Sequence, residues 1–225
     1  MNKKRTIVLL VAACCLFDGG SFAKHKKNSP SASSGGGTPG EFDYYLLTLS
    51  WAPEFCATNA GERNAAECAS NKHLGLVVHG LWPQFNDGRW PQDCASTPPV
   101  SSATVEHMMN IMPGSSLIQH EWAKHGACSG LSTQDYFAAI EKLYTGLRLP
   151  DDFKRPSNPV RMSPTDIDEE FAAANGASKE AFRVSCPQNQ LSAVEVCVSK
   201  AMHYQACPNT VKECRASSIE VRPVW

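Results

Sequence analysis

The sequence predicts a single α+β domain in which several helices surround a central antiparallel sheet. Strand-like segments occur near both ends of the predicted domain, at 42–51 and 74–79 and again at 181–186, 191–199 and 217–224. Helical periodicity fills the part between them, and no internal repeat divides the chain. A chain of 225 residues is long enough for one domain with a sizeable core.

The N-terminus has the pattern of an export signal. Residues 1–5 are basic, residues 6–17 are mostly apolar, and Ser21-Phe22-Ala23 fits the small-x-small cleavage rule. We therefore expect a signal peptide at 1–23 and a bacterial protein that is periplasmic or secreted. Val11-Ala12-Ala13-Cys14 resembles a lipoprotein cleavage box, so a lipid anchor on this cysteine is a less favoured alternative. The apolar run is too short to span a bilayer.

Residues 24–40 have the composition of a flexible linker. The stretch Asn28–Gly40 is rich in Ser, Gly and Pro and offers nothing to bury. We therefore expect the folded domain to begin at Glu41 and to span 41–225.

The net charge limits the ways in which this protein binds polyanions. Removal of residues 1–23 takes three of 21 basic and one of 22 acidic residues, which leaves 18 against 21, or −3. Such a charge excludes tight, non-specific binding of nucleic acid, so a polyanionic substrate must be held by local positive charge.

The cysteines predict a disulfide framework. Cys14 and Cys15 fall in the signal, and eight others remain: Cys56, Cys68, Cys94, Cys128, Cys186, Cys197, Cys207 and Cys214. An even number in an exported chain predicts four disulfides, whose pairing the count alone leaves open. No two of the eight are spaced Cys-x-x-Cys, which argues against a zinc site.

The first part of the domain is predicted to contain two strands with a polar segment between them. Residues 42–51 are aromatic and aliphatic, and 56–71 are polar and Ala-rich, which favours a short helix. The nearly continuous apolar run 74–79 predicts a strand buried on both faces, which ends at His79. A turn is expected at Asn86-Asp87-Gly88.

Four helices are predicted in the middle of the chain. Residues 101–112 carry one stripe of Val and Met that we assign to the core, and 116–125 form the next helix. Ser132 and Ser163 have the spacing of N-caps, and Gly176 marks the end of the last helix.

The helix at 116–125 gathers most of the reactive side chains. At about 100° per residue, four ionisable groups fall within about 140° of arc on one face. They are His120, Glu121, Lys124 and His125. Trp122 and Ala123 would then face the core, and Gly126 suits a left-handed residue that ends the helix.

This constellation favours acid–base chemistry. A zinc protease needs histidines four residues apart, but His120 and His125 are five apart and Lys124 takes the required position. No Gly-x-Ser-x-Gly elbow is present, and the cysteines are expected to be oxidised. Two imidazoles and an ammonium suit phosphodiester cleavage by the substrate's own 2′-hydroxyl. The spacing alone leaves an acid–base hydrolase or transferase.

Two segments resemble the catalytic segments of the ribonuclease T(2) family. They are His79-Gly80-Leu81-Trp82-Pro83 and His120-Glu121-Trp122-x-Lys124-His125-Gly126-x-Cys128. Residues 42–56 and Met112-Pro113-Gly114 further resemble the bacterial periplasmic branch of that family, ribonuclease I. The resemblance covers roughly Phe42 to Trp225 and implies a ribonuclease T(2)-like fold. It also implies an endoribonuclease of broad base specificity, which cuts single-stranded RNA through a 2′,3′-cyclic phosphate to 3′-phosphate ends without metal or cofactor.

The resemblance implies roles for the matching residues. His125 would be the general base and His79 the general acid. His120 would help to hold the phosphate, and Glu121 and Lys124 would support the transition state.

The resemblance also implies a site for the base upstream of the scissile phosphate. Trp82 and Trp90 would sandwich this base, with plain core packing of the two rings as the alternative. Gln84 stands where the family often has an aspartate that contacts the base edge, so a purine preference does not carry over.

The disulfide pairs implied by the resemblance are Cys56–Cys68, Cys94–Cys128, Cys186–Cys214 and Cys197–Cys207. The second pair would tie the loop after the His79 segment to the end of the catalytic helix.

Two other functions are weighed against the ribonuclease. One is a catalytically idle, disulfide-rich binding protein on the same scaffold, and the other is an RNase toxin delivered to competitor cells. The ribonuclease hypothesis predicts RNA as substrate, no cleavage of DNA, which lacks the 2′-hydroxyl, no membrane span and a monomer.

Overall fold

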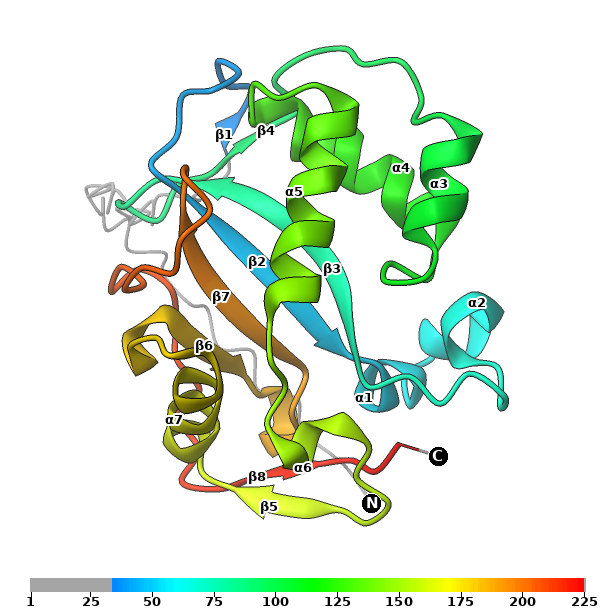
Figure 1. Ribbon diagram of the computed structural model, residues 1–225, viewed down its shortest axis with the longest axis vertical. Coiled ribbons are helices and arrows are strands. Elements are labelled where there is room, and N and C mark those ends of the chain that lie inside the picture. Colours follow the sequence, from blue (N-terminus) through cyan, green and yellow to red (C-terminus); the bar gives the residue numbers. More distant parts are fainter. Residues whose placement is uncertain (1–33, 225) are drawn as a thin grey trace, which may run out of the picture. The chain divides into compact units, whose positions relative to one another are not determined.

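A four-stranded antiparallel sheet, in the order β3-β2-β7-β6, forms the centre of the fold (Figure 1). Its strands are β2 (Tyr44–Trp51), β3 (Leu76–Gln84), β6 (Phe182–Ser185) and β7 (Ala193–Ser199). The predicted α+β class with a central antiparallel sheet is confirmed. The computed structural model describes residues 34–224. The predicted signal peptide, the Cys14 box and the first part of the linker lie outside these residues.

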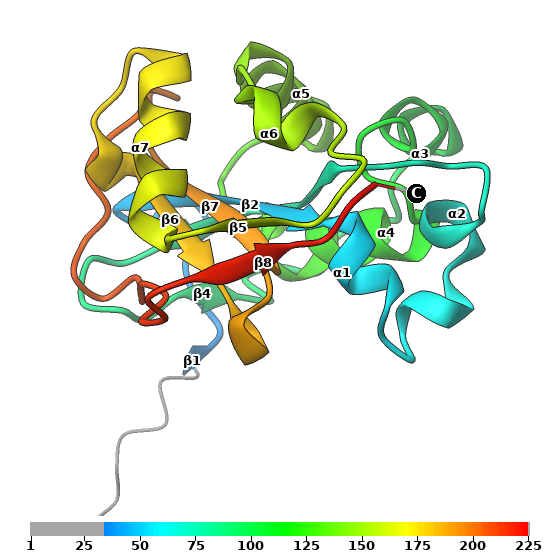
Figure 2. The same ribbon diagram turned by 90° about the horizontal axis from the view of Figure 1, so that it is seen from below.

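The two faces of the sheet have different surroundings. The odd-numbered residues of β2, among them Leu47, Leu49 and Trp51, belong to the main hydrophobic core. Helices α5 (Thr133–Gly146) and α7 (Pro164–Asn175) cover this face and lie on the same side of the sheet (Figure 2). The even-numbered residues of β2, Tyr44 to Ser50, point to the opposite side, which we call the even face.

The remaining helices are shorter and lie around the sheet. They are α1 (Ala52–Cys56), α2 (Ala65–Cys68), α3 (Ser102–Met108), α4 (Ser115–Lys124) and α6 (Asp151–Lys154). Single 3-10 turns occur at Gly61–Arg63, Gly126–Cys128, Lys179–Ala181 and Pro187–Asn189. Helix α4 packs beside β3, the edge strand of the sheet, and this contact brings together the two segments that resemble catalytic segments.

The capping signals place the helix ends correctly. The hydroxyl of Ser132 accepts a hydrogen bond from the backbone N–H of Asp135, and that of Ser163 accepts one from Asp166. Gly176 adopts the left-handed conformation, with φ 59°, at the end of α7. These boundaries follow from local chemistry, so the sequence is enough to predict them.

Two small sheets complete the fold. The three-residue strands β5 (Val160–Met162) and β8 (Ile219–Val221) pair antiparallel. The predicted strand at 217–224 contains β8, whereas β5 has no expected counterpart. The two-residue strands β1 (Ser34–Gly35) and β4 (Pro91–Gln92) pair in parallel.

The strand that carries His79 differs from the prediction. It was expected to end at this histidine, but β3 continues through Trp82 to Gln84. Thr48 pairs with Gly80 and Leu49 pairs with Val78, so His79 is the extra residue of a β-bulge. Because of the bulge, His79 shares the even face with Trp82 and Gln84, although its sequence parity differs from theirs.

The end of the predicted linker is part of the folded unit. The backbone N–H of Gly36 bonds to the Gln92 carbonyl at 3.0 Å, and that of Gly40 bonds to the Cys128 carbonyl at 2.9 Å. A Cβ on Gly37 would lie 2.8 Å from the Cβ of Pro91, so this close approach needs a glycine. Residues 36–40 are therefore docked on the segments around Gln92 and Cys128, which the composition alone did not predict.

Four disulfides cross-link the chain, with the pairing that the resemblance implies. They are Cys56–Cys68, Cys94–Cys128, Cys186–Cys214 and Cys197–Cys207. The Cys197–Cys207 disulfide joins β7 to the loop that follows it and forms a second hydrophobic cluster with Tyr44 and Leu46 on the even face. Within 34–224, no helix combines the length and the apolar composition that a membrane span requires.

Candidate active site

A pocket of about 430 Å³ brings the two predicted catalytic segments together. Its walls come from β2 and β3, from the loop after β3, and from the last turn of α4. The lining residues are Leu46, His79, Trp82, Gln84, Trp90, His120, Glu121, Lys124 and His125. All eight residues that the sequence nominated for catalysis or base binding therefore line one cavity. Leu46, which was not predicted, forms part of its floor.

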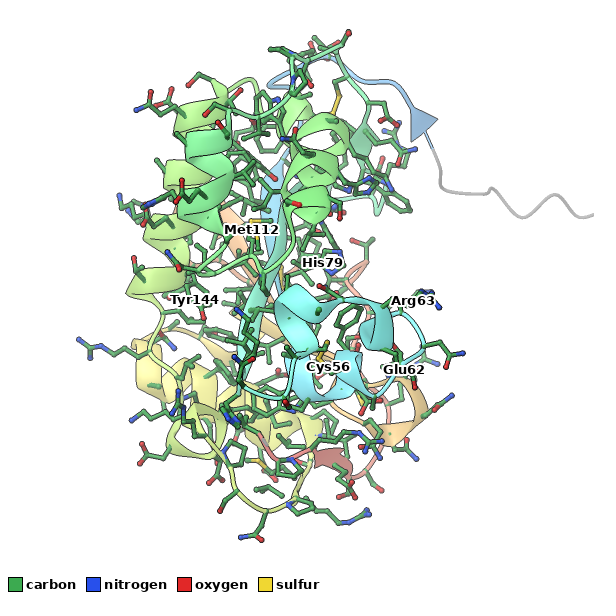
Figure 3. All side chains as sticks on the ribbon, turned by 90° about the vertical axis from the view of Figure 1, so that its right-hand side faces the viewer. Cys56, Glu62, Arg63, His79, Met112 and Tyr144 are labelled. Atoms are coloured by element: carbon green, nitrogen blue, oxygen red, sulfur yellow. A yellow bond between two sulfur atoms is a disulfide. The ribbon has the colours of Figure 1, made fainter. Side chains whose placement is uncertain are left out.

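His79 enters the pocket from the bulge in β3. Its Nδ1 lies 3.3 Å from the hydroxyl of Ser50, on the neighbouring strand, and its Nε2 lies 3.7 Å from Oε1 of Glu121. Figure 3 shows His79 between the α1–α2 segment, which carries Cys56, and the helices above it. Burial lowers the pKa of His79, and the nearby charges of His120 and Lys124 lower it further. The two ring nitrogens therefore face Ser50 and Glu121, and the ring itself lines the pocket.

Glu121 is almost fully buried, with 1% of its surface exposed. Its Oε2 accepts a hydrogen bond of 2.7 Å from the indole Nε1 of Trp82. Burial raises the pKa of Glu121 to about 7, an effect that the Trp82 hydrogen bond and the charge of Lys124 partly oppose. The carboxyl group therefore titrates in the range where histidines do.

Gly80 makes room for this carboxylate. A Cβ at this position would collide with Oε2 of Glu121 and would lie 2.5 Å from Nε1 of Trp82. The glycine of the His-Gly-Leu-Trp-Pro segment is thus required by the close approach of the buried pair. The sequence contained this signal, a glycine directly after the histidine, but it did not show what approaches it.

His125 lies at the end of α4 and is 7% exposed. Burial lowers its pKa to about 3, and the charges of Lys124, His120 and His79 act in the same direction. Its Nδ1 is buried without a hydrogen-bond partner among the described residues. Only Nε2 is then left to meet a molecule in the pocket, and it is neutral at ordinary pH.

His120 and Lys124 supply the positive side of the pocket. They lie one helical turn apart on α4, with His120 exposed and Lys124 half-buried. Both lower the pKa of His79 and of His125. Among residues 34–224, no group of three or more His, Cys, Asp or Glu side chains is arranged to hold a metal ion.

The orientation of α4 corrects part of the predicted helix face. Trp122 is buried as expected, but Ala123 is exposed, and Glu121 is buried in its place. The reason is that β3 approaches α4 from the side of Glu121 and receives its carboxylate beneath Trp82.

Gly126 also differs from the prediction. It is not the left-handed end of the helix but the first residue of a 3-10 turn at Gly126–Cys128. A Cβ on it would collide with the ring of Trp122 and lie 3.0 Å from that of Tyr136. The glycine is needed for the close packing of Trp122 and Tyr136 at this turn.

The loop that carries Trp90 is fastened to this same turn. The Cys94–Cys128 disulfide links the two, and the backbone N–H of Asp93 bonds to the Lys124 carbonyl at 2.8 Å. Both ties hold the pocket wall formed by Trp90 at a fixed place relative to Lys124 and His125.

Trp82 makes more contacts than a stacking platform needs. Its ring lies 5.4 Å from the ring of His79, edge-on, and 5.4 Å from that of His125, tilted by 36°. With its hydrogen bond to Glu121, Trp82 touches three of the candidate catalytic side chains. The half-buried ring of Trp82 both packs against the second hydrophobic cluster and lines the pocket.

The comparisons with known proteins agree with this arrangement. The model of the Ribonuclease T2 family matches residues 42–207. A ribonuclease of Aeromonas hydrophila is 43% identical over 100 residues, which cover 44% of this chain and 44% of that relative. Ribonuclease I of Escherichia coli is 28% identical over 204 residues, covering 71% of this chain and 75% of the other. The match thus spans less than half of the Aeromonas protein.

A solved structure supports the fold over most of the chain. RNase NT in complex with 5′-AMP superimposes with a TM-score of 0.65 at 25% identity, and the match covers 81% of this chain and 99% of that one. Taken with the family match and the pocket, these similarities show that the chain belongs to the ribonuclease T(2) family.

Proposed function

We propose that this protein is an endoribonuclease that cleaves single-stranded RNA by transphosphorylation. The 2′-hydroxyl attacks the adjacent phosphorus, the bond to the 5′-oxygen breaks, and a 2′,3′-cyclic phosphate forms. Water then opens this ring to a 3′-phosphate. One observation carries the assignment: two imidazoles from different elements share a pocket with an ammonium group and a buried carboxyl.

His125 is the general base for the first step. Its low pKa keeps it neutral at ordinary pH, and Nε2 is the nitrogen left to accept the proton of the 2′-hydroxyl. Positive charge on His125 would be disfavoured by Lys124 and His120 in the empty pocket. The negative phosphate of a bound substrate offsets this effect, so the proton transfer becomes easier once RNA is bound.

His79 is the general acid that protonates the departing 5′-oxygen. It must carry a proton when substrate is bound, and two groups favour this state. The phosphate supplies negative charge, and Glu121 lies 3.7 Å from Nε2. Ser50 supports the orientation of the ring through the Nδ1 contact at 3.3 Å.

Lys124 and His120 meet the phosphate. In the transition state, negative charge accumulates on the oxygens around the five-coordinate phosphorus, and cations held in a half-buried pocket stabilise it more than water does. Glu121 contributes indirectly, by holding His79 and Trp82 in place.

Trp82, Gln84 and Trp90 form the site for the upstream base. Stacking is worth roughly 1–3 kcal/mol per base and tolerates every base, which supports broad specificity. The amide of Gln84 both donates and accepts hydrogen bonds, so it suits purines and pyrimidines alike. The complex of RNase NT with 5′-AMP supports a nucleotide as the ligand of this type of fold.

We further propose that the enzyme needs no metal or cofactor, acts as a monomer, does not cut DNA, and works in the periplasm or outside the cell. The export signal and the four disulfides support this location.

Product analysis on defined dinucleotides, with EDTA present, tests the whole assignment. We expect 2′,3′-cyclic phosphate first and 3′-phosphate later, a bell-shaped pH dependence of kcat/KM, and no reaction with 2′-deoxy analogues. His79→Ala and His125→Ala should each lower kcat by roughly 10²–10⁴-fold. The matched control is His107→Ala, which removes an exposed histidine that pairs with Glu141 on α5. Cleavage of RNA by the His79→Ala, His125→Ala double variant at the parental rate would refute this assignment of the active site. No cleavage of RNA by the parent protein would leave an idle binding protein as the better description.

A further inference from the structure

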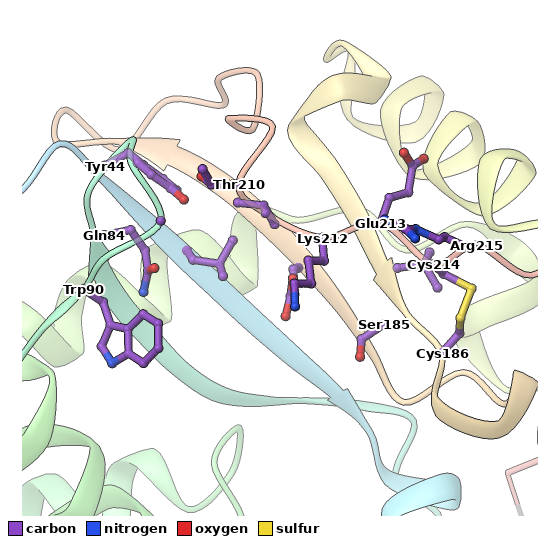
Figure 4. Close-up of a pocket in the computed structure, with 15 residues that line it drawn as sticks. Tyr44, Gln84, Trp90, Ser185, Cys186, Thr210, Lys212, Glu213, Cys214 and Arg215 are labelled. Atoms are coloured by element: carbon purple, nitrogen blue, oxygen red, sulfur yellow. A yellow bond between two sulfur atoms is a disulfide. The ribbon is translucent and has the colours of Figure 1, made fainter. Parts of the chain in front are cut away.

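A second pocket adjoins the candidate active site on the even face of the sheet. It has a volume of about 420 Å³ and shares Leu46, Gln84 and Trp90 with the first. From this common wall it runs across β2 and β7 to β6 and to the loop 209–215 (Figure 4). Trp90, Gln84 and Tyr44 lie at one end, and Arg215 lies at the other, beside the Cys186–Cys214 disulfide. The two pockets therefore adjoin each other at Leu46, Gln84 and Trp90.

We propose that this second pocket binds the nucleotide on the 5′ side of the reacting nucleotide, with Lys212 meeting the phosphate that joins the two and Arg215 adding positive charge at the far end of the pocket. The inference rests on the proposed function, because it extends the same RNA chain beyond the reacting nucleotide. The candidate active site alone accommodates a dinucleotide. The second pocket would bind one more nucleotide of a longer RNA chain.

The direction of the chain follows from the position of the shared wall. The reacting ribose carries the scissile phosphate on its 3′ side, toward His79 and Lys124, and its base lies between Trp82 and Trp90 in the proposed function. The 5′-oxygen of this same ribose, which connects it to the preceding nucleotide, points to the other side. The second pocket begins at Trp90 and Gln84 and extends away from the histidines, so it is reached from the 5′ end.

The charges of the pocket suit a phosphodiester. Lys212 and Arg215 are exposed, and neither is in an ion pair among the described residues. Glu213, on the same segment, points toward α7, away from the Trp90 end (Figure 4), and its charge acts on Asp168 of α7. Two cations are thus available in the pocket.

The floor offers groups that suit a base or a ribose. Glu195 of β7 is half-buried there, and burial raises its pKa to about 7, so a protonated carboxyl that donates a hydrogen bond is present near neutral pH. Ser185 and Thr210 add hydroxyl groups, and Trp90 offers a ring for stacking. An acidic peptide could pair with Lys212 and Arg215, but it has no base to stack on the ring of Trp90.

Substrates with a single ribonucleotide test the inference, because only one bond in each is cleavable. The reference is a dinucleotide of uridine followed by deoxyadenosine. One extended form adds thymidine on the 5′ side, another adds deoxyadenosine on the 3′ side, and a third adds only a 5′-phosphate. We expect the 5′ nucleotide to raise kcat/KM about tenfold. The 5′-phosphate alone should give part of this increase. Any effect of the 3′ extension should not depend on Lys212 and Arg215.

The variant Lys212→Ala, Arg215→Ala should show little of this increase and cleave the dinucleotide at the parental rate. The matched control is Lys142→Ala, Arg148→Ala, which removes the same charge from exposed positions at and just after α5, on the other side of the sheet. If the increase is equally small in the control, general attraction explains it and the site is overturned. The absence of any increase in the parent protein overturns the site as well, while cleavage of the dinucleotide still upholds the proposed function.

Binding of uncleavable deoxythymidine oligomers decides the question even if no RNA is cut. In the Lys212→Ala, Arg215→Ala variant, the plot of log Kobs against log salt concentration should become shallower by about 0.7 for each phosphate that the protein no longer neutralises. An unchanged slope, or equal displacement of the oligomer by an acidic peptide, would refute a nucleotide site.

Discussion

The indole N–H of Trp82 donates a hydrogen bond of 2.7 Å to Oε2 of Glu121, across 39 residues of sequence. The same ring packs edge-on against His79 and at a tilt against His125, each at 5.4 Å. Trp82 therefore links the acid, the base and the buried carboxyl of the proposed mechanism, in addition to any stacking on a substrate base.

Replacing Trp82 with Phe should separate these two roles. Phe keeps an aromatic ring but leaves the buried Glu121 oxygen without its donor, which raises the pKa of Glu121 because that hydrogen bond lowers it. We expect kcat to fall about tenfold, the equivalent of ~1.4 kcal/mol, with a shifted pH profile. Trp90→Phe is the matched control, and it should change KM more than kcat. A Trp82→Phe enzyme with parental kcat and pH profile would show that the ring acts by stacking alone.

Replacing Gly80 with Ala should inactivate the enzyme although every proposed catalytic residue is kept. The new methyl group would collide with Glu121 and approach Trp82 to 2.5 Å, so one of the two must leave its place. We expect the free energy of unfolding to fall by about 1–3 kcal/mol and activity on dinucleotides to be nearly abolished. Gly146→Ala is the control, since nothing lies within 4 Å of its Cβ at the end of α5, and it should be neutral or slightly stabilising. Full activity in Gly80→Ala would mean that Glu121 is dispensable.

Glu121 should make stability depend on pH. Its pKa is raised to about 7 in the folded state from 4.5, so the folded protein holds a proton that the unfolded chain has released. The associated stability is complete below pH 4.5 and is lost as the pH rises through 7. The Glu121→Gln variant lacks this pH-dependent contribution. Between about pH 4.5 and 8, its unfolding free energy should therefore fall by up to about 3 kcal/mol less than that of the parent protein.

Urea unfolding across this pH range measures the difference. Glu62→Gln serves as the control because this glutamate is exposed on the turn after α1 (Figure 3). Parallel curves for the parent and Glu121→Gln would show that folding does not shift the pKa of this carboxyl.

The Cys94–Cys128 disulfide should matter for catalysis as well as stability. It closes a loop of 34 residues, and Cys186–Cys214 closes one of 28, so removal of either pair should cost a similar amount, about 2–4 kcal/mol. Only the first fastens the Trp90 loop to the turn that carries His125. We expect the double Ala variant of that pair to lose dinucleotide cleavage well below its unfolding temperature, and the other to keep it. Equal losses of activity in both would assign the first bridge a purely structural role.

Features set by local chemistry could be predicted from the sequence. Ser132 and Ser163 cap their helices because a hydroxyl at that position meets a free backbone N–H two or three residues on, whatever the rest of the chain does. The membership of His79, His120, Lys124 and His125 in one site followed from residue types that suit one reaction and from the resemblance to a family.

Features set by pairing and packing between distant segments could not be predicted in this way. The bulge at His79 depends on the register between β2 and β3, and the burial of Glu121 on α4 depends on the approach of Trp82 from β3. The prediction that Ala123 lies in the core was wrong because helical periodicity shows which residues share a face, but not which face packs against another element. The three-residue strand β5 and the pocket residues Lys212 and Arg215 carry no periodic signal at all.

The bulge in β3 also determines which changes in length the site tolerates. In a regular strand, His79 would point to one side of the sheet, and Trp82 and Gln84 to the other. His79 is the additional residue between Val78 and Gly80, the partners of Leu49 and Thr48, and it brings the proposed proton donor to the same side as the proposed base-binding residues. Inserting or deleting a single residue between His79 and Trp82 would therefore split the site across two faces, although every catalytic side chain remained in the chain. Among natural relatives, the spacing from this histidine to the tryptophan should thus be as constrained as the identity of either residue.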